Sequence, residues 1–241
     1  MHSVYAPLRE RLYAICEAER LLGEHVHIQA RVLSTEEAIG NPEGDDFPLQ
    51  KGRERLMEAS FGQGRGQAFT DRFGDFSGRL DQILEMELQN NYRRAVFVAT
   101  MNAVLHHLGQ VGGTIHCRDS APTECAAKLA EHLHNEYGRP RITQIGYQPK
   151  MVERLQDHFE YRIVDLDPEN IGQAKGKVVV EGPETSAEAR EWADLLLVTG
   201  TTLVNDTITD FLNGKEVLFY GTTVAGAAAL MDWPRFCACS S

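Results

Sequence analysis

Several features that would assign this chain to a class of protein are absent from it. No apolar run approaches the roughly 18 residues that a membrane-spanning helix needs. The first segment, MHSVYAPLRERLYAICEAER, carries charges throughout and lacks the apolar core of a signal peptide. We therefore expect a cytoplasmic protein with no membrane partner.

Basic residues are scarce as well. Lys and Arg total 24 against 35 Asp and Glu, which gives a formal net charge of −11 at pH 7. Proteins that bind nucleic acid place clustered Lys and Arg against the phosphates, so this balance argues against a nucleic-acid partner. It is compatible with a small-molecule or metal-cation ligand.

Catalytic signatures are missing too. The chain has no Ser-His-Asp pattern, no His-Glu-x-x-His and no P-loop, so the sequence supports no reaction class. A cysteine framework is also absent, because the five cysteines are odd in number and a cytosolic chain keeps its thiols reduced. Nothing in the sequence indicates the oligomeric state, and a homo-oligomer stays open.

The 241 residues suffice for one large domain or two small ones, and the pattern changes near residue 140. Before it, an amphipathic helix near the N-terminus leads to a strand in HVHIQARVL and a loop over residues 34–54. A glycine-weakened strand in GQGRGQAFT and helices in FSGRLDQILEMEL and YRRAVFVATMNAVLHHL follow. We expect a smaller α+β domain over residues 1–115.

From Arg141 onward, short β-branched strands alternate with helices. Strands are expected in RITQIG, YRIVDL, KVVVEG, LLLVTG and EVLFYG, and helices in PKMVERLQDHF, TSAEAREWAD, NDTITDFLNG and VAGAAALM. Asn205 is the expected N-cap of the third of these helices. The alternation predicts an α/β fold, a Rossmann-like domain with a parallel sheet over residues 116–241.

Ligands of parallel sheets bind at the carboxyl ends of the strands, so the residues after each strand are the candidates. Thr199-Gly200-Thr201-Thr202 and Gly221-Thr222-Thr223 follow two of the strands. Glycine permits close approach of a ligand, and threonine hydroxyls with free helix N–H groups form a cradle for an oxyanion. The alternative is that these residues only turn the chain and cap helices. We expect Gly200 in a conformation that only glycine tolerates.

Acidic residues follow another strand. Asp165 stands 19 residues after Gly146, near the spacing at which dinucleotide-binding folds place a ribose-binding carboxylate, and Asp167 is close by. The acidic strand end is also typical of methyltransferases that use S-adenosylmethionine. However, Tyr147 and Pro149 stand where a pyrophosphate needs bare backbone, so ordinary NAD binding is disfavoured. Turn formation before Pro168 explains both acids equally well.

The cysteines offer soft metal ligands. Cys117 lies between the two expected domains, and Cys237-Ala-Cys239 is near the end of the chain. Neither the spacing of Cys237 and Cys239 nor that of Cys117 and Cys125 is usual for zinc. Cys125 lies on an apolar helix face, which favours a buried thiol. If a ten-residue helix precedes the tail, it is about 15 Å long and carries the tail pair away from the ligand edge. Cys117 is therefore expected to be the thiol nearest the ligand.

The stretches TGTTLVNDTI and FYGTTVAGAAALM, with IGYQP and DLDPENIG upstream, resemble a family of prokaryotic two-domain proteins to which heavy-metal chelation has been ascribed. The resemblance implies a domain like the N-terminal domain of enolase, a Rossmann-like domain and a cleft between them. It places Asn102 in the cleft from the first domain. From the second it implies the residues Gly146, Tyr147, Pro149, Asp165, Asp167, Asn170, Thr199, Gly200, Thr201, Thr202, Asn205, Gly221, Thr222 and Thr223. An enolase-like fold does not import enolase chemistry.

Two functions follow as hypotheses. The first is binding of a small anionic or metal-bound ligand in the interdomain cleft, with a transition or heavy metal ion as cofactor and Cys117, Cys237 or Cys239 as metal ligands. The second is an enzyme that acts on a nucleotide-like or phosphorylated substrate, with S-adenosylmethionine as cosubstrate.

Overall fold

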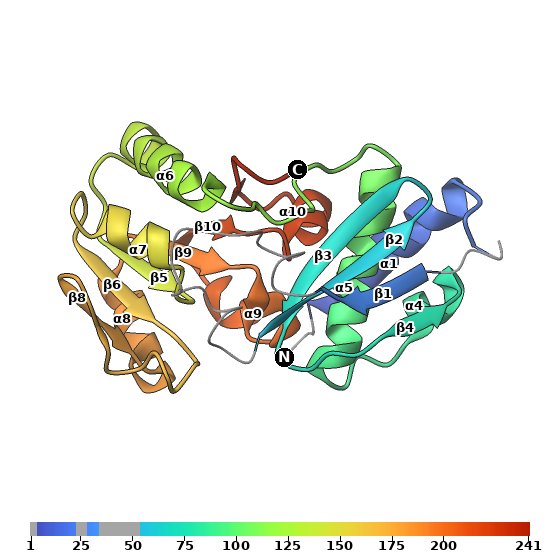
Figure 1. Cartoon of the computed structure of the whole chain (residues 1–241), viewed down its shortest axis with the longest axis horizontal. Helices are drawn as coiled ribbons and strands as arrows, with labels where there is room; N and C mark the ends of the chain where they lie inside the picture. Colours follow the sequence, from blue (N-terminus) through green and yellow to red (C-terminus); the bar gives the residue numbers. More distant parts are fainter. Residues whose placement is uncertain (1–3, 23–27, 34–53) are drawn as a thin grey trace.

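The computed structural model describes residues 4–22, 28–33 and 54–241. It contains two sheets, which lie side by side along the long axis of the molecule (Figure 1). Across these described ranges, no helix is long and apolar enough to cross a membrane. The loop predicted over residues 34–54 falls almost entirely outside the described residues.

The smaller sheet is antiparallel and has the strand order β3-β2-β1-β4. Its strands are β1 (Ile28–Val32), β2 (Arg55–Phe61), β3 (Gly64–Thr70) and β4 (Phe76–Gly78). Among the described residues, the helices that accompany it are α1 (Tyr5–Ala18), α4 (Leu80–Glu85) and α5 (Asn91–His107). The predicted first helix, the strand at β1, the glycine-rich strand β3 and the helix α5 are confirmed. Strand β2 was not predicted, and the segment expected as one helix from Phe76 divides into β4 and α4.

The larger sheet has the order β11-β10-β9-β5-β6-β8-β7 and is parallel except for β7 at one edge. Its strands are β5 (Ile142–Ile145), β6 (Tyr161–Val164), β7 (Ala174–Lys175), β8 (Val178–Glu181), β9 (Leu195–Thr199), β10 (Glu216–Tyr220) and β11 (Arg235–Phe236). Helix α6 (Ala121–Tyr137) precedes these strands, and between them lie α7 (Pro149–Leu155), α8 (Ser186–Trp192), α9 (Thr201–Val204) and α10 (Ala225–Met231), with the 3₁₀ turns η1 (Pro183–Thr185) and η2 (Ile208–Phe211). The order β8-β6-β5-β9-β10-β11 is the order of a Rossmann fold, so the predicted α/β class is confirmed.

Strand β9 shows why the larger sheet is covered on both faces. Side chains alternate along a strand, and every apolar residue of β9 is buried. Leu195 and Leu197 join the core beneath α6 and α7, whereas Leu196 and Val198 join the core that contains α1, α5 and α10. A continuous run of apolar residues is what a parallel sheet with two covered faces requires.

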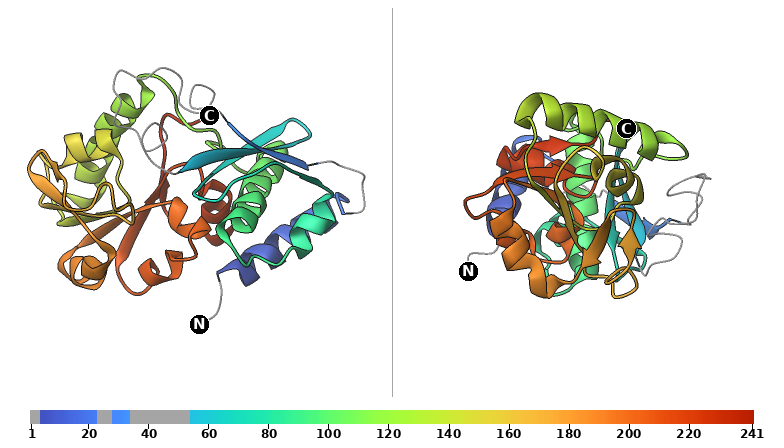
Figure 2. Two further views of the ribbon diagram at one scale, coloured as in Figure 1. Left: turned by 60° about the horizontal axis from the view of Figure 1, so that its bottom comes forward. Right: turned by 90° about the vertical axis from the view of Figure 1, so that its left-hand side faces the viewer.

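Helix α5 connects the two halves of the molecule. It packs along β3 and β2 on one side and against α10 and α9 on the other, as the left view of Figure 2 shows for α10. One continuous apolar core therefore extends from the small sheet to the large one. The proposed boundary between residues 115 and 116, and the likeness of the first part to enolase, stay predictions.

Glycines in β3 permit the close packing of α5. A Cβ on Gly66 would lie 2.2 Å from the backbone nitrogen of Ala103, and one on Gly64 would lie 2.1 Å from the Ala103 carbonyl oxygen. These distances leave no space for a side chain, so the sheet and the helix backbone touch directly.

Candidate functional site

The site lies where the order of the large sheet reverses. From β5 the chain continues to β6 and β8 on one side, and β9, β10 and β11 follow on the other. At this switch point Gly146, which follows β5, has a φ of +91°, and a Cβ there would lie 2.6 Å from Cγ2 of Thr199. The two strand ends thus touch only because residue 146 is a glycine.

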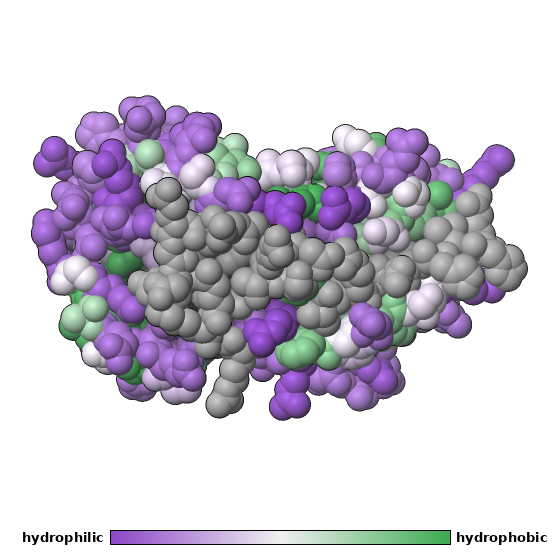
Figure 3. Space-filling model, viewed as in Figure 1, coloured by the Kyte–Doolittle hydropathy of each residue, from purple (hydrophilic) through white to green (hydrophobic). Residues whose placement is uncertain are grey.

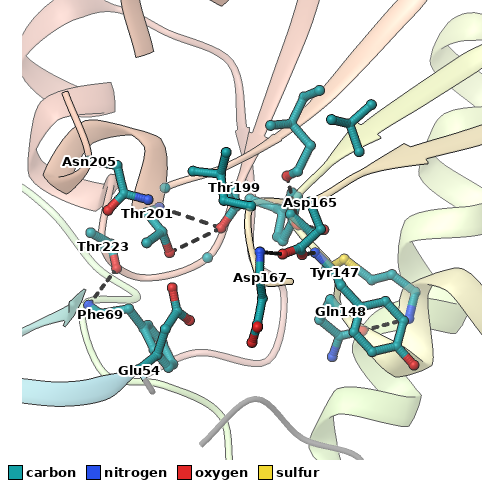
Figure 4. A pocket seen from close by; sticks show the side chains of 18 of the residues that line it. Glu54, Phe69, Tyr147, Gln148, Asp165, Asp167, Thr199, Thr201, Asn205 and Thr223 are labelled. Atoms are coloured by element: carbon teal, nitrogen blue, oxygen red, sulfur yellow. Dashed lines mark hydrogen bonds between the residues drawn. The ribbon is translucent and has the colours of Figure 1, made fainter. Parts of the chain in front are cut away.

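A pocket of about 320 Å³ opens at these strand ends (Figure 4). Its described lining comes from both sheets, the segment before α6, the loops after β5, β6, β8, β9 and β10, and the C-terminal tail. The residues are Glu54, Phe69, His116, Cys117, Pro122, Cys125, Ile145, Gly146, Tyr147, Gln148, Met151, Val164, Asp165, Leu166, Asp167, Asn170, Pro183, Ser186, Thr199, Gly200, Thr201, Asn205, Thr207, Asp210, Phe211, Tyr220, Gly221, Thr223 and Cys237.

Most of the residues predicted from the sequence line this pocket. They are Gly146, Tyr147, Asp165, Asp167, Asn170, Thr199, Gly200, Thr201, Asn205, Gly221, Thr223, Cys117 and Cys237. That any of them binds a ligand stays a prediction. The other predicted residues, Asn102, Pro149, Thr202, Thr222 and Cys239, are not part of the lining.

Asn102, which was expected in the cleft, instead makes hydrogen bonds to the backbone. Its side chain is fully buried in α5, where the amide nitrogen donates to the carbonyls of Gln67, Thr222 and Thr223 at 2.9, 3.2 and 3.2 Å. Its oxygen accepts from the N–H of Gly226 at 2.7 Å. Both the nitrogen and the oxygen of the amide are hydrogen-bonded to backbone groups. Asn102 therefore links the loop after β10 to the small sheet.

The prediction of a helix that begins at Asn205 is wrong. Helix α9 precedes this residue, and the N–H of Asn205 bonds to the Thr201 carbonyl as the C-terminal cap of α9. Asp206 then adopts a left-handed conformation with a φ of +62°, which a helix cannot continue through. Only the short turn η2 follows, so the expected N-cap at Asn205 does not form.

The prediction that Gly200 adopts a conformation that only glycine tolerates is wrong. Gly200 has an ordinary φ of −61°. A Cβ at this position would nevertheless lie 2.7 Å from the backbone nitrogen of Val224 and 3.1 Å from Cβ of Thr223. Glycine is needed here because the loop after β10 presses against the loop after β9.

The threonine hydroxyls differ in how they are engaged within the protein. Thr202 donates to the carbonyl of Thr199 at 2.7 Å, and Thr223 accepts from the N–H of Phe69 at 3.0 Å. The hydroxyls of Thr199 and Thr201 lie 3.3 Å apart at the pocket wall. Thr222 is fully buried with no partner for its hydroxyl among the described residues. A hydroxyl that accepts a hydrogen bond can still donate its own proton, so Thr223 and one of the pair Thr199 and Thr201 keep a donor, and the oxyanion cradle stays a prediction.

Asp165 holds two loops together. Its carboxylate accepts from the N–H of Tyr147, after β5, and from the N–H of Asp167 at 2.7 Å, after β6 (Figure 4). Burial raises the pKa of Asp165, although these hydrogen bonds favour its charged form. Asp167 in turn accepts from the N–H of Glu169 at 3.0 Å. The turn-forming interpretation of the two acids is therefore supported for both.

The pocket is acidic. Its charged residues in the described lining are Glu54, Asp165, Asp167 and Asp210, with no Lys or Arg among them. Burial, together with the charges of Asp165, Asp167 and Asp71, raises the pKa of Glu54 to about 7. In Figure 4 the carboxylates of Glu54 and Asp167 border the same open space. The visible face of the molecule in Figure 3 is mostly hydrophilic outside the grey residues, in keeping with the charged composition.

The C-terminal tail returns to the pocket, so its predicted position is wrong. Helix α10 has 7 residues and is about 10 Å long, and β11 then runs parallel to β10 toward the same carboxyl edge. Ser241 pairs with Ile115 through two backbone hydrogen bonds of 2.7 and 3.2 Å. Cys237 consequently lines the pocket together with Cys117, and that Cys117 is the thiol nearest the ligand stays a prediction.

Two side chains beside these thiols were not singled out as site residues. Cys125, expected to be inert, is buried but forms part of the pocket wall. His116 lies with its ring 5.2 Å from that of Phe69, its Nδ1 has no partner among the described residues, and burial lowers its pKa to about 4. Among the described residues, no group of three or more His, Cys, Asp or Glu side chains is already placed to hold a metal ion.

Comparison with known proteins gives the family context. Residues 128–231 match the model of a family, DUF364, whose description is “Putative heavy-metal chelation”. A solved structure of a DUF364 protein of unknown function from Pyrococcus horikoshii is similar, with a TM-score of 0.54 and 14% identity, over 91% of this chain and 79% of that one. A second, from Desulfitobacterium hafniense DCB-2, has a TM-score of 0.50 and 16% identity over 73% and 72%. No curated protein matches the sequence.

Proposed function

Since residues 128–231 carry the sequence pattern of the family described as “Putative heavy-metal chelation”, we propose that the pocket at the switch point binds a cationic, metal-containing small molecule. The observation that carries the proposal is the charge of the pocket. Each charged side chain of its described lining is a carboxylate, and the half-buried Glu54 lies near the charges of Asp165, Asp167 and Asp71. A cationic ligand relieves the repulsion between these groups, whereas an anion adds to it.

The size of the pocket supports a complex rather than a bare ion. A water molecule takes about 30 Å³ in the liquid, so a pocket of about 320 Å³ is several times larger than one ion needs. Phe69, Met151 and Phe211 contribute apolar surface to the wall. Such a wall suits the organic part of a chelate, and a few polar groups then orient the charged part.

The donor atoms present suit a transition metal. Carboxylates, thiols and a neutral imidazole all serve as ligands of such metals, and His116 is kept neutral by its burial. Its Nδ1 has no hydrogen-bond partner among the described residues. Glu54 and Asp167 would hold the positive end of the ligand, and the metal would supply Lewis acidity and charge there.

The test is a binding titration of the untagged, metal-free protein with divalent metal ions, alone and as complexes with small organic chelators. We expect tighter binding of the cationic complexes than of the free ions or of the chelators alone. Glu54→Gln with Asp167→Asn should weaken this binding strongly. Glu17→Gln, which removes one charge on an exposed face of α1, is the control. Unchanged affinity in the double variant, or stabilisation by phosphate or sulfate instead, would overturn the proposal.

A second candidate rests on the strand order. Rossmann folds of this order bind nucleosides at the switch point, and S-adenosylmethionine carries a positive sulfonium that an acidic pocket would accept. Against it, both oxygens of Asp165 already accept backbone N–H groups, which leaves the carboxylate fewer acceptor sites for a ribose. Thermal stabilisation by S-adenosylmethionine, but not by S-adenosylhomocysteine, which lacks the sulfonium charge, would favour this candidate over the metal complex.

A further inference from the structure

Hydrogen bonds between two asparagine side chains connect helix α5 to the wall of the pocket. Asn91 is the first residue of α5, and Asn205 directly follows α9 and lines the pocket. The Nδ2 of Asn91 donates to Oδ1 of Asn205 at 3.3 Å. The orientation of the Asn205 amide therefore depends on which atom Asn91 turns toward it.

The neighbours of Asn91 allow only one orientation of its amide. Its Oδ1 accepts from the guanidinium of Arg94 at 2.5 Å, and its Nδ2 donates to Oδ1 of Asp71 at 2.7 Å. A guanidinium has only donors and an ionised carboxylate has only acceptors, so a reversed amide would set donor against donor and acceptor against acceptor. The oxygen of Asn91 must face Arg94, and its nitrogen is left for Asn205.

Arg94 holds this arrangement in place. Its side chain is buried, its Nε donates to the carbonyl of Val204 at 2.6 Å, and one terminal nitrogen donates to the carbonyl of Leu88 at 3.0 Å. A buried guanidinium cannot turn away from such acceptors without leaving its donors unpaired. Because Val204 directly precedes Asn205, α5 fixes both the backbone and the side chain of this pocket residue.

Asn205 consequently keeps its NH₂ group for the pocket. Its oxygen already accepts from α5, and its Nδ2 has no hydrogen-bond partner among the described residues. Thr223 and one of the pair Thr199 and Thr201 keep a hydroxyl proton as well. Figure 4 shows Asn205, Thr201 and Thr223 together on one side of the pocket. This side therefore offers several neutral donors.

The acids Asp165 and Asp167 lie on the other side of the pocket (Figure 4). They follow β6, whereas Asn205 and Thr223 belong to the loops after β9 and β10. Strand β5 lies between β6 and β9, and neighbouring strands are about 4.8 Å apart, so the ends of β6 and β9 are about 10 Å apart. The pocket thus attracts positive charge at one end and presents donors at the other.

We propose that Asn205 is a specificity-determining residue, whose NH₂ group binds a carbonyl or carboxylate oxygen at the end of the ligand opposite its positive charge. This role rests on the proposed function, in which the acids hold the positive end. An oxygen of this kind has lone pairs for the donors of Asn205 and Thr223, whereas a hydrocarbon end would leave them unpaired. The ligand class is a small molecule with a cationic end and an oxygen acceptor about one pocket width away.

Three probes that share a protonated amine test the acceptor end without any metal. Pentan-1-amine ends in a methyl group, 5-aminopentanamide in a neutral amide and 5-aminopentanoate in a carboxylate. Each is titrated into the whole, metal-free chain by calorimetry or NMR. We expect at least one oxygen-bearing probe to bind roughly three- to tenfold more tightly than pentan-1-amine, which is the effect of about one hydrogen bond. The stronger of the two identifies the acceptor as carbonyl or carboxylate.

Asn205→Ala should reduce this preference by the same factor, since it removes the donor. Asn213→Ala is the matched control, because Asn213 is exposed and lies outside the described lining. Thermal melts show whether each variant is folded.

A double variant, Asn91→Asp with Asp71→Asn, tests the orientation while Asn205 and the net charge stay unchanged. An acid is tolerated at the first position of a helix. Residue 91 then offers only acceptors, so Asn205 should turn its nitrogen toward α5 and its oxygen toward the pocket. The preference for an oxygen-bearing probe should be lost as in Asn205→Ala, and this variant decides if Asn205→Ala does not fold.

The proposal is overturned if pentan-1-amine binds as tightly as the other probes, if no probe binds, or if the preference survives Asn205→Ala or the double variant. Failure of the proposed function gives a different result. Asp167→Asn should weaken all three probes to a similar extent, because they share the amine, and should leave the ratio of their affinities unchanged. If the affinities do not change in Asp167→Asn, the acids do not hold the positive end, whereas the ratio still reports on Asn205.

Discussion

The side-chain oxygen of Asn102 accepts a hydrogen bond of 2.7 Å from the N–H of Gly226, which joins the middle of α5 to the start of α10. The amide nitrogen of the same residue donates to the carbonyls of Thr222 and Thr223 at 3.2 Å. The side chain is fully buried. Asn102 therefore determines where the loop after β10, one wall of the pocket, lies relative to the small sheet.

Replacement of this side chain should be costly. Asn102→Ala leaves the Gly226 N–H without a partner in a buried place, and an unpaired buried group costs roughly 1–3 kcal/mol. With the lost packing, we expect the free energy of unfolding to fall by about 3 kcal/mol in urea denaturation. Asn213→Ala removes one exposed hydrogen bond, to the Thr209 carbonyl, and is the control. Equal stability of the two variants would contradict the role assigned to Asn102.

The contact between β3 and α5 gives a second prediction. A Cβ on Gly66 would lie 2.2 Å from the Ala103 nitrogen and 2.4 Å from the Ala99 carbonyl oxygen, so Gly66→Ala must push the strand from the helix. We expect a loss of about 3 kcal/mol or more in the free energy of unfolding, at the upper end of overpacking effects. A Cβ on Gly112 meets nothing within 4 Å, so Gly112→Ala should leave the midpoint of denaturation almost unchanged.

Glu54 should make stability depend on pH. Its pKa is about 7 in the folded protein and about 4.5 when unperturbed, so the folded state keeps the proton to a higher pH than the unfolded state. The free energy of unfolding should therefore decrease as the pH rises from 4.5 to 7. Glu54→Gln removes this cost, and we expect the variant to be more stable than the wild type at pH 8 but not at pH 4.5.

Urea denaturation of the metal-free protein at the two pH values measures this difference. Glu17→Gln, on the exposed side of α1, should show the wild-type dependence on pH. A Glu54→Gln variant that is equally destabilised at both values would show that Glu54 is ionised at little cost. A more stable variant that also binds the cationic ligand less well would be typical of a functional carboxylate.

The parts of the fold that sequence pattern predicted are those set by local rules. Pro149 starts α7, and the apolar run from Leu195 forms a strand buried on both faces. The loops after β5, β6, β9 and β10 could be assigned to one edge because all parallel strands end there. The helix after Asn205 was predicted wrongly since the interruption depends on the left-handed Asp206, which periodicity does not reveal.

The rest of the site depends on contacts between distant segments. Glu54 and Phe69 reach the pocket only because α5 places the small sheet beside the loop after β10, and no pattern near either residue signals it. Strand β11 has 2 residues, too few for any periodicity, yet it directs the tail back to the pocket. His116, Cys117 and Cys125 looked unrelated to Cys237 for the same reason. Spacing along the chain therefore does not predict which cysteines meet when a strand as short as β11 sets the direction of the tail.

The last prediction separates two roles for the acids after β6. In Asp165→Asn, one oxygen becomes an NH₂ group that cannot accept the N–H of Tyr147 or Asp167, so the variant should lose roughly 1–3 kcal/mol of stability. Asp167 accepts a single N–H, from Glu169 in an exposed turn, and Asp167→Asn should cost little. Both variants remove one negative charge from the pocket and should weaken the binding of a cationic metal complex to a similar extent. If Asp165 instead binds a ribose, Asp165→Asn alone should abolish stabilisation by an adenosyl ligand, and thermal melts of the two variants with each ligand distinguish these outcomes.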